Sequence, residues 1–198
     1  MTSGEVLAPT RERLLAAAQE LIEDGGYGAA SVAAIAERAG VAAGTLYRHF
    51  DSKQELFVEV FRSVCAREER AMRAASAAVE SGGAVEQLER VLGTFAERAL
   101  RNPRLAWALL AEPVDPLVDA ERLAYRERYA AMVAEGLRTG IDSGELPAQN
   151  VELTAAALVG GCGEALVGPL SPVAGTRPSS EEIVSALRTF VRRAAGAS

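Results

Sequence analysis

Residues 31–53 read SVAAIAERAGVAAGTLYRHFDSK and contain the single histidine and the single lysine of this 198-residue chain, His49 and Lys53. Arginine supplies the remaining basic side chains. Gly40 stands between two short apolar-periodic segments, where a glycine provides the left-handed backbone that a tight turn needs. The pattern predicts two short helices joined by a turn, and the second, at about 43–49, offers small and polar side chains outward.

A capping signal is expected at the start of the helices in and after this run. Ser31 is predicted to cap the first short helix by accepting from its backbone N–H groups. The segment 51–54 is interpreted as a capping box, with Asp51 accepting from the new helix and Gln54 reaching back. A long helix is expected from there to about 82–83, with an apolar face formed by Leu56, Phe57, Val60, Phe61, Val64 and Cys65.

Helical periodicity also dominates the rest of the chain. Apolar residues recur at spacings of three and four, and the alternation of half-buried strands is nearly absent, so an all-α protein of about nine helices is predicted. A first helix is expected from Thr10, as its N-cap, to about 25–26. Asn102 and Asp115 each precede a proline at a first helical position, and residues 179–182 form a further capping-box pattern.

Composition limits the classes of protein that this chain can belong to. Its formal net charge of −6 argues against nonspecific adhesion to nucleic acid. Cys65 and Cys162 fit neither a disulfide framework nor a zinc-ligand spacing, which indicates a reducing compartment and therefore the cytoplasm. Neither a secretion signal nor a run of eighteen apolar residues is found, so we expect a soluble protein with no membrane partner.

Residues 31–53 resemble the N-terminal DNA-binding domain of TetR-family transcriptional regulators. The residues that carry the resemblance are Ala36, Gly40, Val41, Gly44, Thr45, Leu46, Tyr47, His49, Phe50 and Lys53. It implies a three-helix, helix-turn-helix DNA-binding domain over residues 1–53. It also implies a long helix that joins this domain to a ligand-binding and dimerisation bundle over residues 54–198. The second helix of the motif would enter the major groove of a double-stranded DNA operator.

The same resemblance implies roles for individual residues of the motif. Phosphate contacts are expected from Tyr47, His49 and Lys53. Contacts to base edges or to the adjacent backbone are expected from Ala43, Gly44, Thr45 and Arg48. The chemistry agrees, because Lys53 is a point charge at a helix N-terminus and Arg48 can pair bidentately with guanine. Leu46 and Phe50 are assigned to packing.

The chain departs from the family pattern in its caps and in its charge. Ala42 stands where a polar cap is usual, and Val32 and Ala33 stand where the family often has a hydroxyl and a polar residue. Ser31 is therefore open to two interpretations, a pure N-cap or a phosphate contact. Residues 1–53 contain five basic and seven acidic side chains, a balance of −2, so binding has to depend on local placement and on two copies.

The C-terminal part contains candidate ligand-pocket residues. The resemblance implies a small-molecule cavity that could include Phe61, Cys65, Phe95, Trp107, Tyr125, Tyr129 and Cys162. The alternative for each of them is ordinary helix-bundle core. Trp107 and Tyr125 are the favoured candidates, because their polar atoms need partners when they are buried. Glu112, beside a proline bend, is either a polar anchor for the ligand or a solvent-facing carboxylate.

The last two helices are the candidate dimer interface. A helix at about 151–167 carries small residues on one side, namely Ala156, Gly160 and Gly163. The final helix has a stripe of Ile183, Leu187, Phe190, Val191 and Ala194. Both faces could fold back on the bundle, whereas the resemblance implies that they pair with a second copy as a homodimer.

A one-component transcriptional regulator follows from these observations, and a repressor released by a small molecule is the expected type. The alternative is a helical ligand-binding or scaffolding dimer that does not bind DNA. An enzyme is not expected, because no triad pattern, metal-ligand spacing or phosphate-binding loop is present. No metal and no cofactor are expected.

Overall fold

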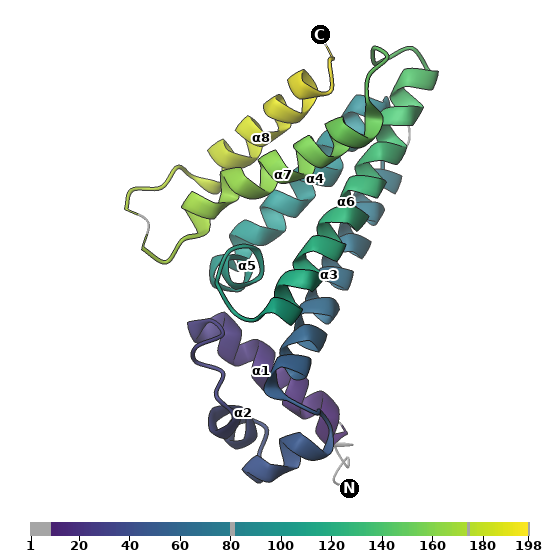
Figure 1. Cartoon of the computed structure of the whole chain (residues 1–198). Coiled ribbons are helices and arrows are strands. Elements are labelled where there is room, and N and C mark those ends of the chain that lie inside the picture. Colours follow the sequence, from purple (N-terminus) through teal and green to yellow (C-terminus); the bar gives the residue numbers. More distant parts are fainter. Residues whose placement is uncertain (1–8, 80–81, 174, 198) are drawn as a thin grey trace, which may run out of the picture.

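The computed structural model of the protein describes residues 9–79, 82–173 and 175–197 (Figure 1). These residues form helices and connecting loops without strands, as the sequence predicts. The helices are α1 (Thr10–Gly25), α2 (Val32–Arg38), the 3-10 helix η1 (Ala43–Arg48), α3 (Lys53–Ala77), α4 (Ala84–Arg101), α5 (Pro103–Leu110), α6 (Pro116–Asp142), α7 (Val151–Leu170) and α8 (Ser180–Ala194).

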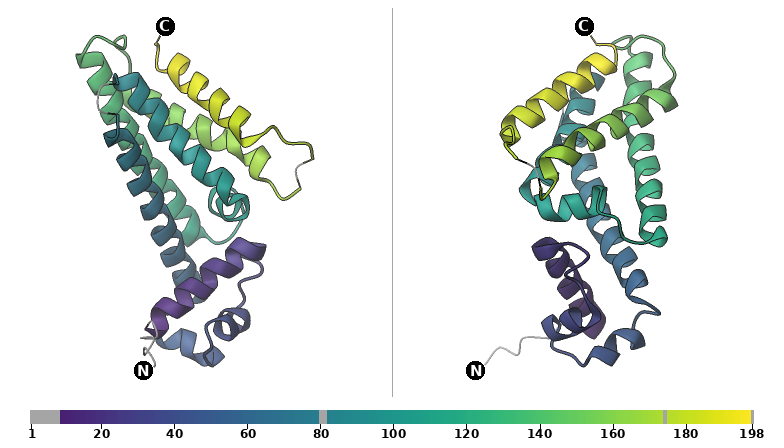
Figure 2. Two further views of the ribbon diagram at one scale, coloured as in Figure 1. Left: turned by 180° about the vertical axis from the view of Figure 1, so that it is seen from behind. Right: turned by 60° about the vertical axis from the view of Figure 1, so that its left-hand side comes forward.

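The helices form a small N-terminal cluster and a larger bundle. In Figures 1 and 2, α1, α2 and η1 lie at one end of the molecule, and α3 runs from this cluster into the bundle beside α4 and α6. The bundle core is built from aliphatic side chains such as Met72, Leu88, Leu137 and Leu158, which are at most 2% exposed. Helix α3 therefore belongs to both parts of the molecule and connects them.

Three predictions at the N-terminal end are wrong in detail. Thr10 is the first residue of α1, and Pro9 occupies the cap position without a side-chain hydrogen bond. The helix expected at 43–49 is a 3-10 helix that ends at Arg48. The capping box predicted at 51–54 is displaced by one residue, because Ser52 has the extended backbone of an N-cap.

The side chains around Ser52 show how α3 begins. The Ser52 hydroxyl accepts a hydrogen bond of 3.1 Å from the backbone N–H of Glu55, and the Glu55 carboxylate accepts one of 2.5 Å from the N–H of Asp51. Glu55 thus reaches back in the way that was expected of Gln54. The apolar face predicted for this helix is buried as expected, although α3 ends at Ala77 rather than near 82–83.

The N-caps of the bundle helices agree more closely with those predicted from the sequence. Asn102 and Asp115 accept from the backbone N–H groups of Leu105 and Leu117 at 3.2 and 2.9 Å. Ser179 and Glu182 form the predicted capping box at the start of α8. Helix α7 continues to Leu170, with Pro169 inside its last turn, so the loop before α8 is shorter than expected.

Helix α7 is the one helix in the described ranges that is long and apolar enough to cross a membrane by length and composition alone. Its buried side packs into the bundle, chiefly against α6, through Ala155, Leu158, Cys162 and Leu166. Its other side carries Ala156 and Gly160, which are exposed. A Cβ atom placed on Gly160 would meet no atom of another described helix within 4 Å, and Gly160 also lines a cavity of the bundle.

The predicted stripe of α8 is only partly buried. Ile183, Leu187 and Val191 lie in the core, whereas Ala194 is exposed and Phe190 is 40% exposed. The Phe190 ring lies beside Gly161 of α7, where an added Cβ would come within 3.0 Å of it. The exposed face of α7 and the outer edge of α8 therefore lie next to each other.

Candidate functional site

The turn between α2 and η1 is fixed by its backbone and by α1. Gly40 has a φ of +65°, the left-handed conformation predicted for this position. The N–H of Val41 donates to the carbonyl of Ala36 at 2.9 Å, and the N–H of Gly40 donates to that of Glu37 at 3.0 Å, a Schellman ending for α2. Because Arg13 of α1 also donates to the Gly40 carbonyl at 3.1 Å, the turn is joined to a second helix.

The side chains of η1 separate into a packing side and an outward side. Leu46 is fully buried and Phe50 is 2% exposed, which confirms that they pack. Tyr47 is 59% exposed, and Arg48 and His49 are also exposed. An aromatic ring that is more than half exposed beside a cation and an imidazole gives this surface three hydrogen-bond donors that can face a ligand.

The remaining residues expected to contact DNA surround these three. Ser31, Ala43 and Gly44 are exposed, and Thr45 is half-buried. Lys53 is half-buried in the first turn of α3, with its ammonium nitrogen 5.2 Å from the centre of the Phe57 ring. All of these residues lie at the end of the molecule that is remote from α8 (Figure 1).

Ser31 acts as the predicted cap of α2. Its hydroxyl oxygen accepts a hydrogen bond of 3.1 Å from the N–H of Ala34. The hydroxyl proton remains available as a donor, since the cap uses only an acceptor lone pair. Capping and a phosphate contact are therefore compatible, and the phosphate contact stays a prediction.

Three of the five basic residues between Pro9 and Lys53 are engaged within the protein. Arg38 pairs with Glu20 at 3.1 Å and Asp24 at 3.3 Å, and the hydrogen bonds that its guanidinium donates to these carboxylates raise its pKa. Arg11 pairs with the Glu59 carboxylate, and Arg13 is bonded to backbone carbonyls of the turn.

Arg48 and Lys53 are the two basic residues of this segment for which neither an ion pair nor a side-chain hydrogen bond is found among the described residues. The positive charge available to a phosphate backbone is therefore smaller than a count of basic residues indicates. It is also concentrated on η1 and on the first turn of α3, which flank the exposed Tyr47 and His49.

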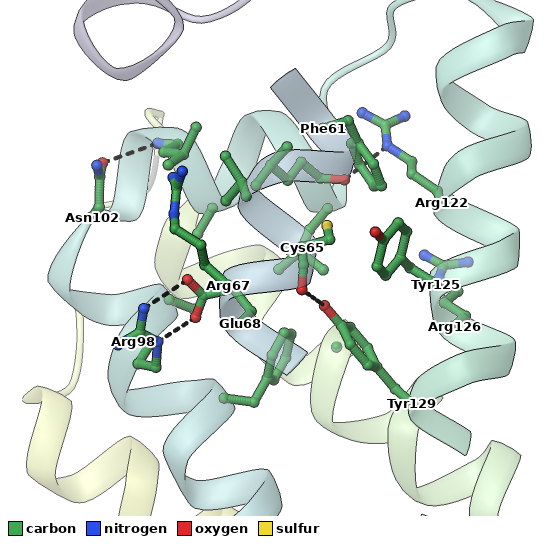
Figure 3. A pocket seen from close by; sticks show the side chains of 18 of the residues that line it. Phe61, Cys65, Arg67, Glu68, Arg98, Asn102, Arg122, Tyr125, Arg126 and Tyr129 are labelled. Carbon is green, nitrogen blue, oxygen red and sulfur yellow. Dashed lines mark hydrogen bonds and ion pairs between the residues drawn. The ribbon is translucent and has the colours of Figure 1, made fainter. Parts of the chain in front are cut away.

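A second candidate site is a cavity of about 430 Å³ among α3, α4, α5, α6 and α7, with Gln19 and Glu23 of α1 also in its lining. Five of the predicted pocket residues line it, namely Phe61, Cys65, Phe95, Tyr125 and Tyr129. Figure 3 shows Cys65 between two groups of labelled side chains, with Arg67, Glu68 and Arg98 on one side and Arg122, Tyr125, Arg126 and Tyr129 on the other.

The other three predicted pocket residues lie outside this lining. Cys162 is fully buried on the core side of α7. Trp107 is half-buried on α5, whose lining residues instead include Leu105 and Ala106. Glu112 lies 3.8 Å from the guanidinium of Arg104, so it is neither a ligand anchor in the cavity nor a freely solvated carboxylate.

Polar atoms of the aromatic residues find partners in the protein. The Tyr125 hydroxyl donates to the carbonyl of Arg62 at 3.1 Å, and the Tyr129 hydroxyl donates to that of Cys65 at 3.3 Å. Burial raises the pKa of the Cys65 thiol to about 12 and also raises the pKa of Tyr129, so both groups are neutral near pH 7. Neither group therefore supplies the cavity with an activated thiolate or phenolate.

The charged residues of the cavity were not predicted from the sequence. They are Arg67, Arg98, Arg101, Arg122, Arg126, Glu23, Glu68 and Glu164. Five arginines against three glutamates leave +2, in a chain whose total charge is −6. The place of Glu68 could have been predicted from the sequence. It follows Phe61, Val64 and Cys65 at the spacing of three and four residues that puts side chains on one face of a helix.

Two hydrogen bonds connect α1 with the bundle beside this cavity. Arg67 of α3 donates to the side-chain oxygen of Gln19 at 3.0 Å, and Arg104 of α5 donates to the carbonyl of Gly25 at 2.6 Å. Gln19 itself lines the cavity. A molecule in the cavity would therefore touch the helix that fixes the turn of the N-terminal motif.

Comparison with known proteins identifies relatives of the helix-turn-helix region. The family model "Bacterial regulatory proteins, tetR family" matches residues 14–60, which include the turn and η1. The HTH-type transcriptional repressor KstR of Mycolicibacterium smegmatis is 37% identical over 110 residues, 54% of this chain and 51% of KstR. The chain thus spans about half the length of this relative.

Other comparisons extend over more of the chain. The HTH-type transcriptional regulator UidR of Escherichia coli is 28% identical over 153 residues, 76% of each protein. The solved structure of the fatty acid degradation regulator FadR from Bacillus halodurans superposes with a TM-score of 0.78 over 94% of this chain and 96% of that one, at 19% identity, and so shows a shared fold. The match over residues 14–60 shows that the N-terminal helix-turn-helix of this chain is a domain of the tetR family of bacterial regulatory proteins, and the chain as a whole shares its all-helical fold with the FadR structure.

Proposed function

We propose that the chain is a one-component DNA-binding transcriptional regulator, a repressor that a small molecule releases from a palindromic operator. The observation that carries the proposal is the surface of η1, where Tyr47, Arg48 and His49 are exposed on a helix whose preceding turn is fixed by Arg13. Exposed donors on a rigid element are what recognition of phosphates and base edges requires. KstR, to which part of the chain is similar, is a transcriptional repressor, and this supports the direction of the response.

Release by a small molecule is supported by the position of the cavity. It lies among α3, α4, α5, α6 and α7, and Gln19 and Glu23 of α1 also line it. A ligand shifts a conformational equilibrium only through different affinities for the two states. A ligand in contact with α1 and α3 would have different affinities for two conformations that differ in the position of these helices. Both helices lead to the recognition surface.

We further propose that the protein acts as a homodimer through α7 and α8. The exposed Ala156 of α7 and the exposed Phe190 of α8 support this arrangement. A dimer would present two copies of η1 to half-sites about one DNA turn, ~34 Å, apart. It also doubles the number of phosphate contacts, which compensates for the small number of available cations on one recognition surface. Such a protein would work in the cytoplasm.

The alternative function is a helical ligand-binding or scaffolding dimer without DNA binding. One observation favours it: among the basic residues between Pro9 and Lys53, only Arg48 and Lys53 make neither an ion pair nor a side-chain hydrogen bond with the described residues. Selection of bound fragments from a random DNA pool at low salt separates the two functions. We expect enrichment of a palindrome whose half-sites are one turn apart, with affinity that falls steeply as salt rises. No enriched sequence, together with no salt-sensitive gel shift, would support the alternative.

A further inference from the structure

Three of the five arginines that line the cavity are half-buried, namely Arg67, Arg98 and Arg122, whereas Arg101 and Arg126 are exposed. Among the three half-buried ones, Arg67 alone has no ion pair with the described residues. Arg98 is paired with the Glu68 carboxylate at 2.5 and 2.9 Å. Arg122 donates to the carbonyls that end α5. Arg67 instead donates only to neutral groups, the amide oxygen of Gln19 at 3.0 Å and the hydroxyl of Ser63 at 3.3 Å. Within the described residues, no carboxylate lies within ion-pair distance of it.

A half-buried guanidinium with neutral partners is a favourable place for an anion. A carboxylate, sulfonate or phosphate accepts two parallel hydrogen bonds from a guanidinium, and charge-assisted bonds are about twice as strong as neutral ones. The surplus of arginines around the cavity adds attraction, and the low dielectric of its walls strengthens it. The polar end of a ligand is therefore expected to be acidic.

The rest of the cavity requires an apolar body on the same ligand. Phe61, Phe95 and Tyr125 lie along the wall, and the hydroxyl of Tyr125 is already bonded to the backbone. A volume of about 430 Å³ lies within the range of small-molecule sites. The chemistry of the lining therefore favours an amphiphilic molecule with one anionic group.

The neutral partner of Arg67 lies on the helix that holds the DNA-binding turn. Gln19 and Arg13 are both residues of α1, and Arg13 bonds to the turn at Gly40. We propose that the cavity binds an amphiphilic organic anion whose acidic group pairs with Arg67 in place of Gln19, so that the ligand loosens α1 from the bundle. The effect on DNA rests on the function proposed above, whereas the ligand class does not.

A pair of fluorescent dyes tests the ligand class directly. Anilinonaphthalene sulfonate is an aromatic anion, and phenylnaphthylamine is its uncharged analogue. We expect Arg67→Gln in the full-length protein to weaken binding of the sulfonate roughly tenfold or more and to change binding of the neutral dye little. Arg67→Lys keeps the charge and should retain part of the preference for the anion. Arg70→Gln, an exposed change on the same helix, is the matched control and should bind both dyes as the wild type does.

The dye results can also overturn this ligand class. Equal loss of both dyes in Arg67→Gln would show that the residue only supports the cavity wall. No loss of the sulfonate would show that Arg67 is not the anchor. Circular dichroism of each variant confirms that the fold is retained, and so separates these outcomes from unfolding.

A third variant tests the competition with α1. Gln19→Ala removes the neutral partner, so we expect the sulfonate to bind several-fold more tightly and the neutral dye to bind as before. Unchanged sulfonate affinity would overturn the competition. Titration of the sulfonate into a complex with the selected DNA should release DNA from the wild type but not from Arg67→Gln. A protein with the expected dye pattern that binds no DNA would overturn the proposed function alone, and DNA binding without that pattern would overturn only the present inference.

Discussion

Arg13 in α1 donates a hydrogen bond of 3.1 Å to the carbonyl oxygen of Gly40, in the turn that precedes the recognition surface. The two residues lie 27 positions apart in the chain. Gly40 has the left-handed backbone that ends α2, so its carbonyl direction is set by the turn itself. This bond fixes the angle between α1 and η1 and makes α1 a structural part of the recognition surface.

Arg13→Ala should therefore weaken DNA binding although Arg13 is not assigned a DNA contact. We expect a loss of about 1–2 kcal/mol in the free energy of unfolding of the N-terminal cluster, because the carbonyls of the turn lose a charged donor. Thermal unfolding and fluorescence anisotropy with the selected operator measure the two effects. Arg70→Ala is the control. Unchanged DNA affinity in a folded Arg13→Ala protein would show that the backbone bonds of α2 are sufficient to hold the turn.

Lys53 and Arg48 should differ in what their removal does to specificity. Lys53→Ala should weaken binding to all sequences alike and reduce the slope of log affinity against log salt by about 0.9 for each phosphate that is no longer neutralised. Arg48→Ala should cost roughly 1–3 kcal/mol at one base pair and relax the preference there. Affinities for a panel of single-base operator variants measure both effects. A uniform loss from both substitutions would contradict the assignment of Arg48 to base readout.

Ala156→Arg should disrupt the dimer without unfolding the protomer. The side chain at this position lies on the exposed face of α7, so a long cation can extend into solvent in the protomer but would meet the partner helix. Sedimentation velocity should show a shift toward monomer, and operator affinity should fall with it. Ala74→Arg introduces the same side chain at an exposed position of α3 and should remain dimeric. If Ala156→Arg remained a dimer, the proposed interface would be wrong.

Glu182 makes the stability of the α8 start depend on pH. Its carboxylate accepts from the backbone N–H of Ser179 at 2.7 Å, and this bond lowers its pKa. A lowered folded-state pKa means that the stabilisation is present above the pKa of an unfolded glutamate, about 4.3, and is lost as pH falls through the folded value.

Glu182→Gln keeps a hydrogen-bond acceptor and removes the charge, which isolates this effect. We expect the wild type to have the higher melting temperature at pH 7, and the difference from the variant to shrink as pH falls below about 4.3. Melting temperatures measured across this range provide the check. A difference that stays constant down to the lowest pH would show that the carboxylate charge does not contribute.

The helices of the bundle could be predicted because their caps are unambiguous. Asn102 and Asp115 stand directly before a proline, and only one register then satisfies both the cap and the ring. At the start of α3, Asp51 and Ser52 are adjacent capping residues, and Glu55 and Gln54 can both reach back. The observed register goes with the extended backbone of Ser52, a conformation that a local sequence pattern does not contain.

The candidate sites were predictable where they rest on periodicity within one helix. Periodicity predicted that Phe61 and Cys65 lie on the apolar face of α3, and the family resemblance implied their place in the cavity; Leu46 and Phe50 were assigned to packing from their side of the motif. The role of Gln19 could not be found in this way, because it depends on the docking of α1 against α3 and α5. The pairing of Arg11 with Glu59 likewise joins residues that are 48 positions apart.

The engagement of Arg11, Arg13 and Arg38 within the protein has a consequence for how such a regulator would search a chromosome. Nonspecific affinity for DNA comes almost entirely from phosphate neutralisation, and between Pro9 and Lys53 two cations, Arg48 and Lys53, have neither an ion pair nor a hydrogen-bond partner among the described residues. Bulk DNA would therefore hold few molecules, and each encounter would be brief. A larger fraction of the protein would remain free in solution, so a small number of copies per cell would suffice to occupy the operator and to respond when the effector appears.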